Sequence, residues 1–158
     1  MQHSSKEKKF EEKIYELLKT TYLPIIRSEE IMYNFGKHIT INNIVYFDNT
    51  LVCFQTKWAN SSLTISSNDF PYFIACVDEV ARLSNMRTVG IYISNKSLNL
   101  DNKRLLENVN GRSGVNTAFY SIYDMTDPIL IYRVQDFLHT CKMYMYSNDG
   151  DCIMRDSS

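Results

Sequence analysis

The chain lacks any apolar run of the roughly 20 residues that a membrane-spanning helix needs. Residues 1–9 are polar and lack the apolar segment of a secretory signal. We therefore expect an intracellular protein, cytoplasmic or nuclear, that is not secreted and has no membrane partner. No repeat, linker or low-complexity block interrupts the 158 residues. This predicts a single domain over 1–158, with a core from about 5 to 146 and a polar tail over 147–158.

Cysteine and histidine are few and dispersed. The four cysteines include no Cys-x-x-Cys pair, and three of them lie within apolar segments, where a free thiol packs as a small hydrophobic group. The three histidines stand far apart in the sequence. The pattern predicts reduced thiols without a disulfide framework or a Cys/His zinc site.

Neither sign of charge is in excess. The chain has 17 basic and 18 acidic residues, which gives a formal net charge of −1. A nucleic-acid-binding surface would therefore have to be a local basic patch.

The N-terminal segment has the pattern of an amphipathic helix over 5–21, which ends before Pro24. Ser4 and Glu7 have the spacing of a capping box. Glu11 lies at the border of the apolar stripe that follows. Periodicity alone leaves two interpretations of Glu11: a side chain at the edge of the core, or a solvated helix glutamate.

A β-hairpin is predicted from two β-rich segments, 38–47 and 50–58, which flank the turn dipeptide Asp48-Asn49. Further elements are predicted as follows: a helix capped by Asn68 or Asp69, a strand over Thr88–Ser94, a helix from Asn99 or Asp101 to about Asn108, a turn at 111–114, a strand over Thr117–Tyr123, and a helix from Ile129 to about Tyr144. This order predicts an α/β fold with a mixed β-sheet and helices on both faces.

Gln55 and Lys57 fall on one face of the second hairpin strand, because strand side chains alternate. A polar face at the end of an apolar strand indicates either a site or a solvated edge. If the turn is centred on Asp48-Asn49, His38, Thr40 and Asn42 share that face. A bulge would shift the register by one residue and reverse the assignment.

Three segments together resemble the Mrr-like branch of the PD-(D/E)xK restriction-endonuclease-like superfamily. They are Phe10-Glu11 at the start of the first helix, Gln55-Thr56-Lys57-Trp58 after an apolar strand, and Val89-Gly90-Ile91-Tyr92-Ile93-Ser94 after an amphipathic helix. The resemblance covers about residues 8 to 125. It implies a restriction-endonuclease-like fold.

The resemblance also implies a metal-dependent DNA endonuclease that uses Mg²⁺ or Mn²⁺. Glu11 would be the helix carboxylate and Gln55 the third metal-site residue, and Lys57 would be the catalytic lysine. The metal polarises the phosphate and lowers the pKa of the attacking water, while the lysine steadies the developing negative charge. Members of this superfamily often act as dimers, so a homodimer is possible.

The chain departs from the family pattern at the start of the hairpin. Asn34 stands where the family has its first Asp, and His38 stands at the second Asp, which is the main metal ligand. Imidazole suits Mn²⁺ better than Mg²⁺. His38 is therefore either a metal ligand together with Glu11 and Gln55, or an ordinary histidine at the edge of a strand.

Three functions remain open. The first is an active nuclease that uses Glu11, His38, Gln55 and Lys57 with a divalent ion. The second is a catalytically degenerate nuclease fold that binds nucleic acid without cutting it. Its candidate phosphate contacts are Lys57, Lys96, Lys103 and Arg104. The third is a protein-interaction module without a nucleic-acid partner.

Overall fold

The computed structural model describes residues 5–60, 63–110, 115–121, 132–133 and 136. The chain divides into two units, 1–127 and 128–158. The helices and strands named below all belong to the first unit. In the second, the described residues Tyr132, Arg133 and Asp136 are helical. The rest of the helix predicted from Ile129, the polar tail and the turn at 111–114 lie outside the described residues.

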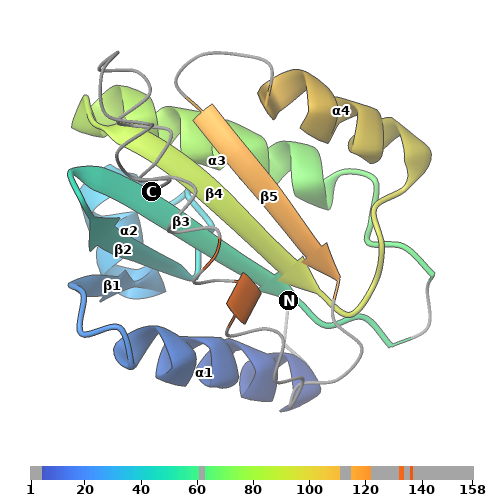
Figure 1. Ribbon diagram of the computed structural model, residues 1–158, viewed down its shortest axis with the longest axis horizontal. Coiled ribbons are helices and arrows are strands. Elements are labelled where there is room, and N and C mark those ends of the chain that lie inside the picture. Colours follow the sequence, from blue (N-terminus) through green and yellow to red (C-terminus); the bar gives the residue numbers. More distant parts are fainter. Residues whose placement is uncertain (1–4, 61–62, 111–114, 122–131, 134–135, 137–158) are drawn as a thin grey trace, which may run out of the picture. The chain divides into compact units, whose positions relative to one another are not determined.

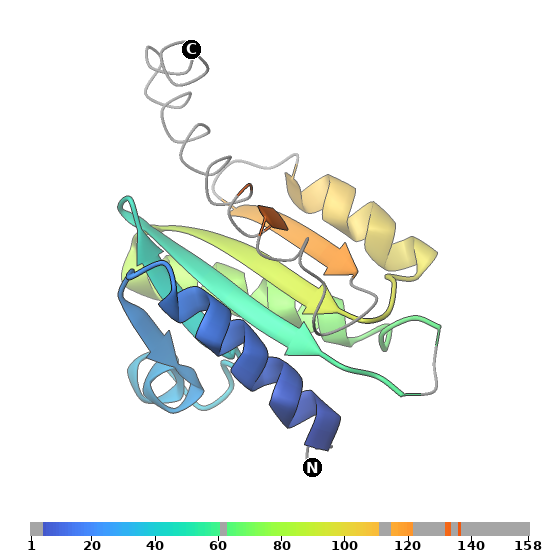
Figure 2. The same cartoon turned by 60° about the horizontal axis from the view of Figure 1, so that its bottom comes forward.

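The first unit is an α/β fold around a five-stranded mixed sheet, as predicted. Its strands follow the order β1-β2-β3-β4-β5, with β1, β2 and β3 antiparallel and β3, β4 and β5 parallel. Helix α1 covers one face of the sheet, while α3 and α4 cover the other (Figures 1 and 2). The elements are α1 (Ser5–Lys19), β1 (Ile25–Arg27), α2 (Ser28–Phe35), β2 (Asn43–Phe47), β3 (Thr50–Lys57), α3 (Asp69–Ser84), β4 (Arg87–Ser94), α4 (Leu100–Asn110) and β5 (Val115–Ser121).

The predicted hairpin register is confirmed. Phe47 pairs with Thr50 and Asn43 with Phe54. Asp48 and Asn49 both adopt positive φ, of 53° and 61°. These values match a two-residue turn whose twist suits a hairpin.

The first hairpin strand is shorter than predicted, because β2 begins at Asn43 rather than at residue 38. The backbone N–H of Asn42 still donates to the carbonyl of Phe54, at 3.0 Å. Beyond this point the Asn42 side chain takes the place of backbone hydrogen bonds between the strands. Its Oδ1 accepts from the backbone N–H of Thr56 at 2.8 Å and from the Thr56 hydroxyl at 3.0 Å. The edge of β3 beyond Phe54 is therefore not covered by β2.

Strand β1 and helix α2 were not predicted. Both are short, at 3 and 8 residues, so neither carries a clear periodic pattern. Helix α2 ends at Phe35 and is capped by Gly36, whose φ of 120° disfavours any residue with a Cβ. A Cβ there would also lie 2.7 Å from the His38 ring.

The core on the α3 face of the sheet is aromatic. Tyr92 of β4 packs edge-to-face against Phe73 of α3, with ring centroids 5.3 Å apart, and stacks on Phe119 of β5. Gly90 lets α3 approach the sheet, because a Cβ at this position would lie 3.0 Å from Phe73 and from Val77. The packing of α3 therefore fixes the position of its first turn relative to β3 and β4.

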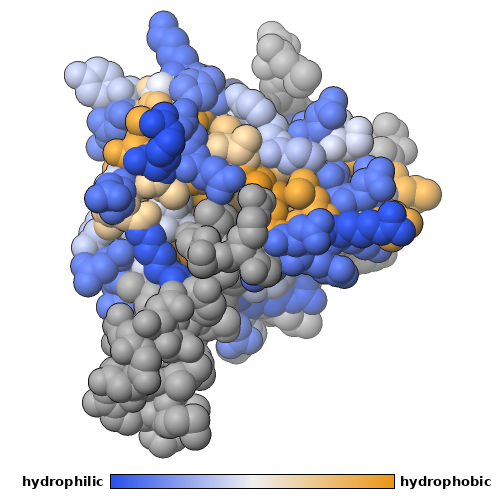
Figure 3. All heavy atoms as spheres, turned by 90° about the horizontal axis from the view of Figure 1, so that it is seen from above, coloured by the Kyte–Doolittle hydropathy of each residue, from blue (hydrophilic) through white to orange (hydrophobic). Residues whose placement is uncertain are grey.

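The surface is mixed. Among the described residues, Tyr22, Tyr33 and Leu63 are large hydrophobic side chains that are almost fully exposed. Seen from above, hydrophobic side chains form an interrupted band between hydrophilic ones (Figure 3). Within the described part of the chain, no helix combines the length and the apolar character that crossing a bilayer requires.

Candidate functional site

Gln55 and Lys57 lie at the C-terminal end of β3, on the face covered by α3. Cys53, two residues before Gln55, belongs to the core cluster on that face, and alternation carries Gln55 and Lys57 to the same side. In the parallel register, Gln55 lies beside Tyr92 and Lys57 beside Ser94. The polar pair therefore stands next to the buried Tyr92 of β4.

A small pocket of about 130 Å³ opens at this end of β3, and we call it the Lys57 pocket. It draws residues from α1, the segment before β2, β3, α3 and β4. The lining residues are Glu7, Thr40, Gln55, Lys57, Asp69, Tyr72, Phe73 and Tyr92.

Glu7 is the carboxylate of α1 that meets the lysine. Its Oε1 lies 3.8 Å from the Nζ of Lys57. Glu7 is only 8% exposed. It begins the buried stripe that Phe10, Ile14 and Leu18 continue at helical spacing. The Phe10 ring also packs edge-on against Trp58, with centroids 5.4 Å apart, which fixes the first turns of α1 beside the end of β3.

Sequence reasoning missed Glu7, although a signal was present. The capping-box pattern with Ser4 gave its carboxylate a local explanation, and Ser4 lies outside the described residues. A glutamate on the apolar stripe of a helix is unusual, because burial of a charge without a partner is costly. The stripe position of Glu7 was the signal that could have identified it.

Asp69 supplies a second carboxylate to the pocket. It is the first residue of α3 and is half-buried. The sequence offered Asn68 or Asp69 as the helix cap. Asn68 occupies the N-cap position but makes no side-chain capping hydrogen bond.

Tyr92 lines the pocket and is 2% exposed. Burial raises the pKa of its hydroxyl above the ordinary tyrosine value, and the negative charges of Asp69 and Glu7 raise it further. Both carboxylates therefore act on the same buried phenol.

The amide oxygen of Gln55 is buried and finds no hydrogen-bond donor in the described part of the chain. A buried acceptor without a partner costs about 1–3 kcal/mol. A donor or cation bound in the pocket would remove that cost.

The pocket includes two of the predicted site residues, Gln55 and Lys57, together with Thr40, which was expected on the same face. Glu11 is not among its lining residues. It lies half-buried one helical turn after Glu7, and its charge, with the larger effect of Glu12, helps to raise the pKa of Arg27.

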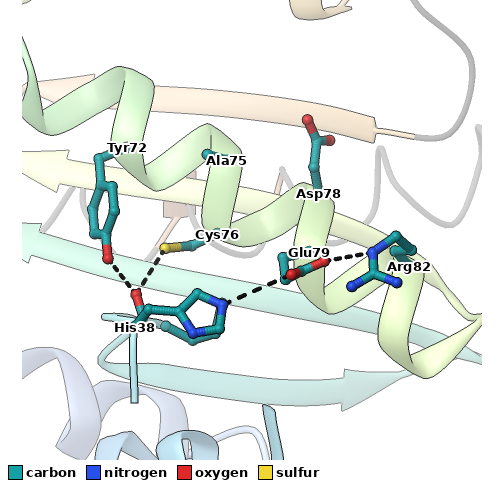
Figure 4. Close-up of a pocket in the computed structure, with 8 residues that line it drawn as sticks. His38, Tyr72, Ala75, Cys76, Asp78, Glu79 and Arg82 are labelled. Atoms are coloured by element: carbon teal, nitrogen blue, oxygen red, sulfur yellow. Dashed lines mark hydrogen bonds and ion pairs between the residues drawn. The ribbon is translucent and has the colours of Figure 1, made fainter. Parts of the chain in front are cut away.

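His38 lies in a separate groove of about 430 Å³ along α3, which we call the His38 groove. Its Nε2 is 3.7 Å from Oε2 of Glu79, whose Oε1 accepts a 2.6 Å hydrogen bond from Nε of Arg82 (Figure 4). The hydrogen bond from Arg82 is the main cause of a lowered pKa at Glu79, and His38 adds to it. Asp78 points away from this group in Figure 4.

Tyr72 lines both the Lys57 pocket and the His38 groove. Its hydroxyl donates a hydrogen bond to the backbone carbonyl of His38. The thiol of Cys76 approaches the same carbonyl at 3.7 Å. The two cavities thus meet at one aromatic side chain, while the His38 imidazole belongs to the groove.

The other predicted phosphate contacts do not line the Lys57 pocket. Lys96 follows the end of β4 and is half-buried, while Lys103 and Arg104 are exposed on α4. Lys103 borders a different cavity, beside Leu98, Leu106 and Phe119.

Cys53 and Cys76 are buried free thiols, and burial raises the pKa of Cys53. Cys141 and Cys152 lie outside the described residues. Within the described ranges, no three His, Cys, Asp or Glu side chains come together as a metal-ligand group. The lining of the Lys57 pocket contains two carboxylates, those of Glu7 and Asp69.

No protein-family model, curated protein or solved structure matches this chain.

Proposed function

We propose that the protein is a divalent-metal-dependent DNA endonuclease whose active site is the Lys57 pocket. One observation carries the proposal: a helix carboxylate, Glu7, and the strand pair Gln55 and Lys57 line one cavity, with Glu7 and Lys57 in contact. The α/β fold with its mixed sheet agrees with the restriction-endonuclease-like architecture that the resemblance implies. In this proposal Glu7 takes the role that the resemblance implies for Glu11.

The donor atoms in the pocket suit a hard cation. Glu7 offers a carboxylate and Gln55 an unpaired amide oxygen, while no imidazole or thiolate is among the lining residues. Mg²⁺ prefers oxygen ligands and is commonly held by one or two carboxylates plus substrate phosphates. When bound, the cation would polarise the phosphate and lower the pKa of the attacking water.

Each side chain has a distinct role. Glu7 and Gln55 would hold the cation, because both bring oxygen atoms to the lining of the pocket. The side chain of Lys57 is 32% exposed, so its ammonium group can reach a phosphate at the mouth of the pocket. There it stabilises the negative charge that develops on the phosphate oxygens. The contact with Glu7 orients the ammonium group before substrate binds.

Plasmid cleavage in Mg²⁺ and in Mn²⁺ tests the proposal. We expect Lys57→Ala and Glu7→Gln each to lower the cleavage rate by about 10²-fold or more, as removal of a charge-stabilising group does in other enzymes. The matched control is Glu16→Gln, because Glu16 is an exposed glutamate of the same helix, paired with Lys19. Thermal melts of every variant would separate a catalytic loss from unfolding.

Glu11→Gln decides which helix carboxylate acts. A rate close to wild type assigns the role to Glu7, whereas a loss confined to Glu11→Gln returns it to Glu11. Cleavage that survives Lys57→Ala, or a wild type that is inert in both metals, would refute the endonuclease.

The second candidate is a degenerate nuclease fold that binds nucleic acid without cutting it. Thr40 favours this candidate, because it lines the pocket with a hydroxyl where a carboxylate would strengthen cation binding. DNA retardation at low salt by a protein that cleaves in neither metal would support it.

A further inference from the structure

Asp69 lies in the Lys57 pocket, and the roles given above leave it unused. It is half-buried at the start of α3, and no basic side chain pairs with it among the described residues. Lys57 is the positively charged side chain among the lining residues, and its ammonium group contacts Glu7. The lining therefore contains two carboxylates and one ammonium group. Such an excess of negative charge favours a bound cation, because two carboxylates in one small pocket repel each other.

One polar group points independently to a missing ligand. The amide oxygen of Gln55 is buried and has no hydrogen-bond partner among the described residues. Buried polar groups in folded proteins are nearly always paired with protein, water or a ligand. The unpaired oxygen of Gln55 belongs to the pocket that contains Asp69 and Glu7.

We infer that Asp69 is a second carboxylate ligand of the divalent cation, so that α3 supplies one carboxylate, α1 the other and β3 the amide oxygen. This inference rests on the proposed function, whose cation site it completes. The resulting set consists of oxygen atoms only, which selects a hard cation over one that prefers nitrogen or sulfur.

Asp101 provides a matched control for a purely structural role of Asp69. An acidic residue in the first turn of a helix is stabilised by the helix dipole, whatever else it does. Asp101 occupies the corresponding first turn of α4 and is exposed. Asp69→Asn and Asp101→Asn should thus lose similar helix-dipole stabilisation, whereas only Asp69→Asn should lose cation affinity.

Tb³⁺ is a suitable probe, because it binds oxygen ligands and emits when a nearby aromatic side chain is excited. We expect the full chain to show saturable Tb³⁺ emission that Mg²⁺ displaces. Asp69→Asn and Glu7→Gln should each weaken Tb³⁺ binding by about tenfold or more, and Asp101→Asn should not. If Asp69→Asn fails to fold, Asp69→Ser offers a second variant with a residue that suits a helix start.

The outcomes separate this inference from the endonuclease proposal. Weakened Tb³⁺ binding in Asp69→Asn, with no cleavage by any protein, supports the cation site and refutes the endonuclease. Cleavage that depends on Glu7 and Lys57, with unchanged Tb³⁺ affinity in Asp69→Asn, refutes the role of Asp69 alone. A wild type that does not bind Tb³⁺ also overturns the inference.

Discussion

The ammonium group of Lys57 lies 3.8 Å from the carboxylate of Glu7, on the helix that covers the opposite face of the sheet. The contact is possible because Lys57 ends β3 and Glu7 lies in the first turn of α1. The pocket therefore combines side chains from both helical layers at one end of the sheet. Changes on either layer should affect its chemistry.

Thr40→Asp should increase cation affinity and Mg²⁺-dependent cleavage. Thr40 is exposed and lines the pocket, so the new carboxylate adds an oxygen ligand and is not itself buried. Without metal, a third carboxylate should lower the melting temperature, and Mg²⁺ should restore it. Tb³⁺ titration and thermal melts with and without EDTA measure both effects.

His38→Asp is the matched control, because His38 lies in the His38 groove beside Glu79. It should leave Mg²⁺ affinity unchanged. A gain in His38→Asp but not in Thr40→Asp would place the cation near His38 and contradict the pocket assignment.

Gly90→Ala should destabilise the fold by about 1–3 kcal/mol, the usual cost of an overpacked core. The added methyl group would meet Phe73 and Val77 at 3.0 Å and push α3 from the sheet. Because α3 carries Asp69, cation affinity should fall in parallel. Urea unfolding and Tb³⁺ titration test this.

Val77→Ala in the Gly90→Ala background should recover part of the lost stability, because it removes one partner in the clash. Val77 does not line the Lys57 pocket. If the two substitutions were simply additive, Gly90 would not be the residue that sets the spacing between α3 and the sheet.

The hairpin could be predicted because its information is local. The dipeptide Asp48-Asn49 favours positive φ, and alternation then fixes the face of Gln55 and Lys57. The segment before β2 could not be predicted in the same way. There Asn42 bonds to Thr56 through its side chain, a tertiary contact that no strand pattern encodes.

Glu7 and Asp69 escaped prediction for a shared reason. Both lie in the first turn of a helix, where acidic residues are common because they suit the local backbone and the helix dipole. That local explanation leaves nothing to suggest a site. Only the packing of α1 and α3 around the end of β3 shows that the two carboxylates share a pocket.

Asn42→Ala should cost about 1–3 kcal/mol, since it leaves the backbone N–H of Thr56 without its acceptor. Asn42→Asp keeps an oxygen at this position and should lose less. Denaturant unfolding measures the cost, and faster amide hydrogen exchange at Thr56 would locate it. Equal losses in the two variants would show that the acceptor is not what matters.

Tyr92→Phe should make the protein less sensitive to alkaline pH. The pKa of Tyr92 is raised in the folded state, so above the ordinary tyrosine value of about 10 the unfolded chain loses this proton first. Wild type therefore loses stability as the pH rises beyond that value, and Tyr92→Phe lacks this contribution. The difference in unfolding free energy between wild type and Tyr92→Phe should therefore shift in favour of the variant from pH 8 to pH 10.5. A constant difference would argue against a raised pKa.

Nucleic-acid binding should depend weakly on salt. The candidate phosphate contacts are few, so the log–log slope should correspond to roughly 2 to 5 released counterions. Replacing Lys103 by Ala should lower that slope by about 1 if the side chain contacts a phosphate. No retardation of DNA or RNA at low salt would favour a protein-interaction module.

The parallel pairing of β3 with β4 has a consequence for folding. Gln55 and Tyr92 become neighbours only after the chain passes through α3 and returns, so the pocket is absent from any intermediate that holds the β2–β3 hairpin alone. A divalent cation would then bind the native state and not its local precursors. Its stabilisation should therefore appear as slower unfolding, with the folding rate almost unchanged.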